Sequence, residues 1–136
     1  MSDWGVDWRG LFLSSTGRLA RNPFLLAAGI LIGVETLYEG LFNLIAHWIT
    51  GWIVYPVIIY ASACVLSKRL HDRGRSGWWA ALILFSIIVG WPHPRGFFFL
   101  LFPIVAIWAI VELAVLPGEQ GANRFGPNPL RSGIMV

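Results

Sequence analysis

The strongest constraint on the fold is a series of long apolar runs, broken at the centre of the chain by one short charged stretch. That stretch, from Lys68 to Arg75, carries five charges in eight residues, and four of them are positive. The chain is 57% hydrophobic and 12% charged, about half the charged share of an ordinary soluble domain. A soluble domain of 136 residues could not bury so much apolar surface, so we predict a polytopic integral membrane protein.

Four apolar runs predict an all-α, four-helix transmembrane bundle. They extend over residues 23–46, 49–67, 77–91 and 97–116, between an N-terminal segment 1–22 and a polar tail 117–136. Asn22 is a candidate N-cap for the first helix, and Pro23 suits a first helical turn. The third run, about 15 residues long, covers roughly 22 Å of a hydrocarbon core about 30 Å thick. A re-entrant segment is therefore the alternative to a full crossing there.

The N-terminal segment is expected to form a short amphipathic helix at the membrane surface and not a cleavable signal. Asp3 and Asp7 stand where a signal peptide would carry positive charge. One helical face would carry Trp4, Trp8, Leu11 and Phe12. A frayed terminus is the alternative, because so short a helix is marginal in water.

The placement of positive residues predicts the orientation of the chain. With four spans, nine of the ten lysines and arginines fall on the side that holds both termini, and only Arg95 falls on the other. Cytoplasmic loops carry the excess of positive charge, so both termini are predicted to be cytoplasmic. The nine are Arg9, Arg18, Arg21, Lys68, Arg69, Arg73, Arg75, Arg124 and Arg131.

Glu35 and Glu39 are acidic residues inside the first predicted span. With Asn43 they recur every four residues, and His47 continues the series, which predicts one stripe on one helix. An ionised side chain at the bilayer centre costs about 2.5–3.5 kcal/mol on insertion scales, so the stripe should face protein or water. It can relay protons, bind a cation or pair with a partner subunit. Two neutral glutamates hydrogen-bonded inside the bundle are the alternative.

Glu112 lies near the inner end of the fourth predicted span. At that depth a carboxylate can reach the cations of the central stretch at the membrane interface. We expect a structural salt bridge from Glu112 to Lys68 or Arg69.

The central stretch is predicted to be a structured loop that binds a lipid phosphate or a partner's carboxylate. Four cations beside Trp78 and Trp79 would attract anionic headgroups, at about 1 kcal/mol per cation. The alternative is that these cations only set the topology. Asp72 can pair with Arg69 or Arg75 and so give the loop an internal structure.

The sequence argues against an enzyme. His71 and Asp72 resemble the His-Asp pair of metal-dependent phosphohydrolases, but His47 and His93 are predicted on the opposite membrane side. Those two histidines share the outer side with Glu39, so a metal or proton site there is the minor alternative to interfacial hydrogen bonding. We find no nucleophile–base pair, cofactor motif or basic face for nucleic acid in the sequence.

Three motifs resemble those of one known family. They read Gly17-Arg18-x-x-Arg21-x-x-Phe24, Arg69-Leu70-His71-Asp72-x-Gly74-Arg75-Ser76-Gly77-Trp78-Trp79 and Gly118-x-x-Gly121-x-Asn123-x-Phe125-Gly126-Pro127-x-Pro129. This pattern resembles the bacterial inner-membrane family catalogued as domain of unknown function 805. The resemblance implies a small multi-span inner-membrane protein and supplies no activity. Glu35 and Glu39 are not marks of that family.

All three motifs fall on the cytoplasmic side of the predicted topology, so we expect them to pack as one inner cap. Arg18 or Arg21 should then lie near Asp72 or Glu112. The residues expected to bind lipid or a partner are Arg18, Arg21, Arg69, His71, Asp72, Arg73, Arg75, Trp78, Trp79 and Asn123.

Three classes of function follow from these residues. The first is a non-enzymatic scaffold or accessory subunit whose cap binds anionic lipid, a partner membrane protein or a second copy of the chain. The alternative is a small proton or cation transporter or channel that uses Glu35 and Glu39. A lipid enzyme using His71 and Asp72 is the least favoured.

Overall fold

The computed structural model describes residues 7–90 and 96–131 of the chain. Over these residues the regular elements are helices, apart from one isolated bridge between Asn123 and Gly126. They are α1 (Trp8–Leu13), α2 (Arg21–Leu41), α3 (Leu44–Asp72), α4 (Trp79–Gly90), α5 (Phe98–Ala109) and the π-helix η1 (Ile110–Val115). The predicted all-α class is confirmed for this part of the chain.

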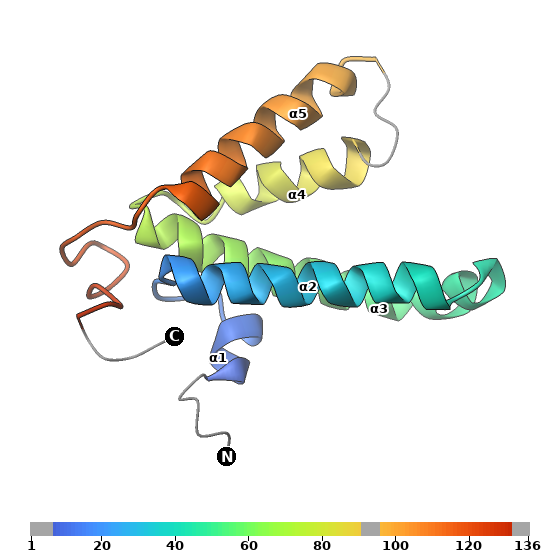
Figure 1. The fold of residues 1–136 in the computed structure, drawn as a ribbon, viewed down its shortest axis with the longest axis horizontal. Coiled ribbons are helices and arrows are strands. Elements are labelled where there is room, and N and C mark those ends of the chain that lie inside the picture. Colours follow the sequence, from blue (N-terminus) through green and yellow to red (C-terminus); the bar gives the residue numbers. More distant parts are fainter. Residues whose placement is uncertain (1–6, 91–95, 132–136) are drawn as a thin grey trace.

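The four long helices form two antiparallel hairpins. Helices α2 and α3 lie side by side in one, and α4 and α5 make the other (Figure 1). The hairpins converge where α3 leads into α4 and diverge toward their other ends (Figure 1). Because of this divergence a closed four-helix bundle is not confirmed. The convergent end also holds η1 and the segment that follows it.

The turn between α2 and α3 differs from the prediction. Asn43 caps α3, and its side-chain Oδ1 accepts a hydrogen bond from the backbone N–H of Ala46 at 3.0 Å. Asparagine stabilises a helix start more than a helix interior, which explains why α2 ends early. The single predicted stripe is therefore wrong: Glu35 and Glu39 lie on α2, while His47 lies on α3.

Helix α2 begins at Arg21, one residue before the predicted cap. Ala20 takes the N-cap position without a side-chain hydrogen bond, so the assignment of Asn22 as the cap is wrong. Pro23 does lie in the first turn, where its missing N–H leaves no bond unmade.

Helix α3 ends in a Schellman motif that turns the chain toward α4. The N–H of Arg75 donates to the carbonyl of Leu70 at 2.8 Å, and the N–H of Gly74 donates to that of His71 at 3.0 Å. Gly74 has a φ of 69°, in the left-handed region that favours glycine. This turn brings Arg75 back toward the convergent end.

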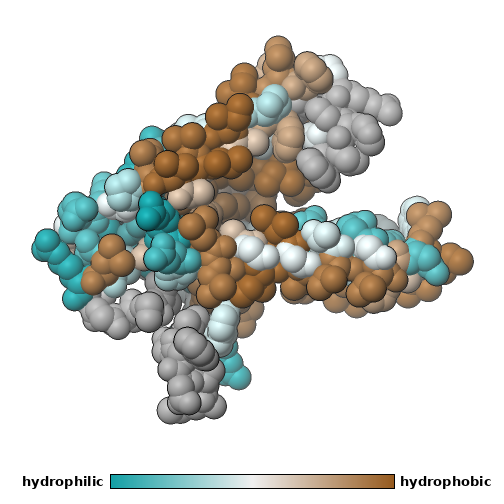
Figure 2. Space-filling view, in the orientation of Figure 1, coloured by the Kyte–Doolittle hydropathy of each residue, from teal (hydrophilic) through white to brown (hydrophobic). Residues whose placement is uncertain are grey.

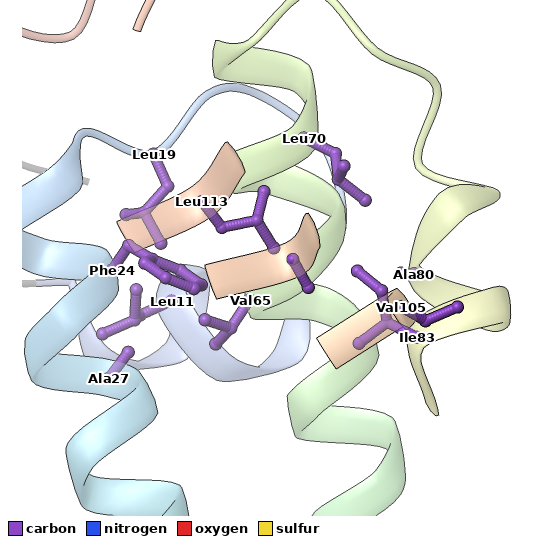
Figure 3. Close-up of a cluster of buried hydrophobic side chains, with 11 residues drawn as sticks. Leu11, Leu19, Phe24, Ala27, Val65, Leu70, Ala80, Ile83, Val105 and Leu113 are labelled. Atoms are coloured by element: carbon purple, nitrogen blue, oxygen red, sulfur yellow. The ribbon is translucent and has the colours of Figure 1, made fainter. Parts of the chain in front are cut away.

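The buried core lies close to the convergent end. Leu11 of α1, Leu19 before α2, Leu70 of α3 and Leu113 of η1 pack there with Phe24 (Figure 3). Each such side chain stabilises the fold by about 1.5–3 kcal/mol when fully buried. Helix α1 confirms a short helix from Trp8 on, with Leu11 buried, while its place at the membrane surface stays a prediction. Trp4 lies outside the described residues.

The surface of the hairpins away from this core is mostly apolar, although Glu35 and Glu39 are exposed on α2. Ile32, Leu37 and Ile53 are each more than 60% exposed, and hydrophobic residues predominate on both hairpins in Figure 2. Among the described residues, two helices are long and apolar enough to cross a membrane: the most apolar 18-residue stretch has a mean hydropathy of 1.6 in α2 and 1.9 in α3. Helix α4 has 12 residues, about 18 Å, so the third predicted span is indeed short.

Candidate functional site

Polar residues gather at the convergent end, which is the teal region of Figure 2. We call this region the polar cap and define it as residues 17–21, 68–79 and 112–131. These segments are distant in the sequence, yet Arg18 Nη2 lies 3.0 Å from Asp72 Oδ1. Arg18 Nη1 also donates to the carbonyl of Gly121 in the tail at 2.6 Å, so the predicted packing of the three motifs is confirmed.

Asp72 is the centre of the polar cap. Its carboxylate is buried and accepts a hydrogen bond from Arg18 Nε at 3.1 Å through Oδ1. The other oxygen, Oδ2, accepts one from Arg69 Nη1. Two buried guanidinium groups thus flank one buried carboxylate, an arrangement in which each charge is compensated only while its partners are in place.

The remaining N–H groups of the two arginines bind backbone carbonyls. Arg69 Nε donates to the carbonyl of Leu113 at 2.9 Å, and Nη2 donates to that of Leu116 at 2.7 Å. Arg18 Nη2 donates to Glu119 O at 2.7 Å, and Nη1 donates to Gly121 O at 2.6 Å. The arginines therefore tie the segment that follows α5 to α3.

The end of η1 explains why these carbonyls are available, because the last four carbonyls of a helix have no partner within it. Short π-helical turns such as η1 often mark functional segments. Arg21 uses a third carbonyl in this region, donating from Nη1 to Val115 O at 3.2 Å. A π-helix could not be predicted at η1, because its residues are those of an ordinary apolar helix.

Glu112 forms the second ion-pair cluster. Its Oε1 accepts from Arg75 Nε at 2.7 Å and from Arg73 Nε at 3.3 Å. The expected partners, Lys68 and Arg69, were wrong, although the salt bridge itself is present. Lys68 faces α1, where its Nζ donates to the carbonyl of Leu11 at 2.8 Å.

His71 and Asn123 join the tail to the end of α3. His71 Nδ1–H donates to the carbonyl of Gly17 at 3.0 Å, and the ring stacks on Phe125 at 3.9 Å. Asn123 Nδ2 donates to the carbonyl of His71 at 2.9 Å. Burial lowers the pKa of His71; the bond to Gly17 opposes this and the charge of Arg124 adds to it. The neutral ring keeps Nε2 as an acceptor.

The exposed part of the polar cap is aromatic and basic. Trp78 is 84% exposed, and Trp79 is also exposed. Arg124 lies 4.7 Å over the ring of Phe125, and Arg131 is exposed at the end of the described tail. Of the expected binding residues, Arg18, Arg69 and Asp72 are buried, Arg21, Trp78 and Trp79 are exposed, and the others are half-buried. Arg124 and Arg131 were not among the residues predicted to bind.

A second polar cluster lies near the α2–α3 turn. Glu39 Oε1 accepts a hydrogen bond from the Tyr55 hydroxyl at 2.5 Å, and Oε2 lies 3.3 Å from His47 Nε2. Glu35 lines a cavity of about 210 Å³ between α2, α3 and α4. Within residues 7–90 and 96–131 no three potential metal ligands cluster, and His93 lies outside these ranges.

The comparisons with known proteins identify one family. A family described as "Protein of unknown function (DUF805)" matches residues 12–127. Uncharacterized protein YiiR of Escherichia coli K12 is 31% identical over 127 residues, covering 83% of this chain and 84% of YiiR. Inner membrane protein YhaH of the same strain is 27% identical over 134 residues, covering 93% and 96%. No solved structure matches. The chain belongs to the DUF805 family.

Proposed function

We propose that this protein is a four-span inner-membrane protein with both termini in the cytoplasm. The name of YhaH, the exposed apolar surface of the two hairpins and the gathering of positive residues at one end support this placement. The polar cap would then lie at the cytoplasmic surface of the membrane, with Trp78 and Trp79 at the headgroup level.

The polar cap serves in this proposal as a non-enzymatic docking platform of a scaffold or accessory subunit. The observation that carries it is the division of the cap's positive charges. Arg18 and Arg69 are buried against Asp72 and backbone carbonyls. Arg124 and Arg131 are exposed, and neither pairs with a carboxylate in the described part of the chain. A rigid base thus presents cations to an acidic partner: anionic lipid headgroups or an acidic protein surface.

Native mass spectrometry of the protein, released gently with its own lipids, tests this proposal. The wild type is expected to retain either anionic lipid or a second protein at fixed stoichiometry. Replacing both Arg124 and Arg131 with Gln should weaken that retention about thirtyfold, since each cation contributes about 1 kcal/mol near an anionic surface.

Arg9→Gln is the control, because Arg9 is also exposed but lies on α1. This variant should keep the bound species, and both variants should keep the unfolding midpoint of the wild type. Unchanged retention in the double variant would refute docking through the exposed arginines.

A small proton or cation transporter is the second candidate. It is favoured by the cavity that Glu35 lines, by the hydrogen bond of Tyr55 to Glu39 and by His47 Nε2, which lies 3.3 Å from Glu39 Oε2. Intramembrane carboxylates commonly mark ion pathways. In proteoliposomes Glu35→Gln and Glu39→Gln should each abolish proton or cation flux, whereas the double change at Arg124 and Arg131 should leave it intact. Equal flux in all variants would exclude this role.

A further inference from the structure

A groove of about 710 Å³ lies between α3 and α4 and begins at the polar cap. Its volume falls within the range of about 300–1,000 Å³ that is usual for small-molecule sites. The end at the cap is polar and is lined by Ser15, Ser67, His71 and Ser76. The opposite end is apolar and is lined by Ile59, Tyr60, Leu84, Phe85 and Ile88. One groove therefore offers a polar mouth and an apolar body.

The mouth offers both an acceptor and donors. Because Nδ1 of His71 donates to Gly17, Nε2 of His71 carries a lone pair. This Nε2 lies beside Gly77, which also lines the groove: a Cβ added to Gly77 would lie 3.0 Å from it. Ser67 Oγ has only a long bond of 3.4 Å, to Gly77 O. Arg124 does not line the groove, but its guanidinium lies 4.7 Å over the ring of Phe125, which stacks on His71, so a positive charge lies near the mouth.

The apolar body matches one membrane leaflet in length. From Ile59 to His71 the groove follows α3 for about 18 Å at the rise of an α-helix. One leaflet supplies about half of a hydrocarbon core roughly 30 Å thick. Ala63 and Ala81 line this body and keep it open, because neither side chain extends beyond Cβ. A chain lying along α3 would thus pass from the cap to the middle of the bilayer.

We propose that this groove binds one acyl chain of an anionic phospholipid with a hydroxyl-bearing headgroup, of the phosphatidylglycerol kind. The serine hydroxyls donate to the ester oxygens, Nε2 of His71 accepts from a headgroup hydroxyl, and the nearby charge of Arg124 attracts the phosphate. A protein helix would leave these polar groups without partners, whereas the lipid satisfies them. The inference rests on the proposed placement of the cap at the cytoplasmic leaflet.

Filling the groove tests the proposal. Ala81 is exposed and lines the groove, so Ala81→Trp should block it with little effect on the core. Leu37→Trp is the matched control, because Leu37 is 62% exposed on α2 and does not line the groove. Each protein is loaded with equal phosphatidylglycerol and phosphatidylethanolamine, and the retained phospholipid is counted by native mass spectrometry.

The wild type and Leu37→Trp should each retain one phospholipid per chain. Ala81→Trp should lower the retained fraction at least about tenfold, since excluding even two methylene groups from the groove weakens binding by that factor. Arg124→Gln should keep the lipid but lower the ratio of phosphatidylglycerol to phosphatidylethanolamine about fivefold.

A wild type without retained phospholipid, or equal retention in Ala81→Trp and Leu37→Trp, would overturn the proposal. An unchanged lipid ratio in Arg124→Gln would overturn the assignment of the anionic headgroup. Ala81 lies outside the exposed arginines that carry the docking function. The two tests can therefore fail separately. Ala81→Trp can lose its lipid although the double variant of Arg124 and Arg131 keeps its partner, and Ala81→Trp can keep its lipid although the double variant loses its partner.

Discussion

Replacing Asp72 with Asn is expected to lower the free energy of unfolding by about 3–5 kcal/mol. The amide keeps the shape of the side chain but removes the charge that compensates Arg18 and Arg69. Both guanidinium groups are buried, so neither gains compensation from water. Reversible unfolding in mixed micelles, followed by tryptophan fluorescence, measures the loss.

A double-mutant cycle tests whether the loss comes from the uncompensated charge. Arg18→Gln with Asp72→Asn removes one charge of each sign, so the double variant should lose less stability than the sum of the two single variants. Asp7→Asn is the surface control, because Asp7 caps α1 and is exposed. This variant should lower the free energy of unfolding by less than about 1 kcal/mol. A loss of under 1 kcal/mol in Asp72→Asn, or strict additivity, would contradict the central role of Asp72.

The residues that form the polar cap could be predicted from the sequence, because the predicted membrane topology places them at the same end of the helices. Positive residues on one side of the predicted spans placed Arg18 and Asp72 at the same end, although they are 54 residues apart. The apolar runs likewise predicted where most of the helices lie. These features depend on composition and period, which a single sequence displays directly.

The partners of the charged groups could not be found in the same way. Arg69 binds the backbone carbonyls of Leu113 and Leu116. Every residue has a backbone carbonyl, so the residue types do not indicate which ones are bound. Glu112 pairs with Arg73 and Arg75 because the Schellman motif at Gly74 turns the chain back, which spacing along a helix does not predict. From the sequence, Asn43 could belong to an intramembrane stripe or cap a helix. The hydrogen bond from the N–H of Ala46 to Asn43 Oδ1 shows that it caps α3.

The close packing of the tail on α3 leads to the second large effect. Replacing Gly118 with Ala is expected to lower the free energy of unfolding by about 1–3 kcal/mol, the usual cost of overpacking. A Cβ at this position would overlap the Asp72 carboxylate. That carboxylate cannot move aside, because Arg18 and Arg69 hold it and the N–H of Glu119 donates to the Asp72 backbone carbonyl at 2.8 Å.

Gly121→Ala is the matched control for Gly118→Ala. The two glycines lie in the same tail segment, both outside the positive-φ region, and a Cβ at Gly121 meets no atom within 4 Å. Its stability should therefore stay within about 0.5 kcal/mol of the wild type. If the tail packs on Asp72 as the structure shows, Gly118→Ala should also expose the tail to limited proteolysis faster than Gly121→Ala. Equal stability and equal cleavage in the two variants would mean that the tail is not held against α3 in the membrane.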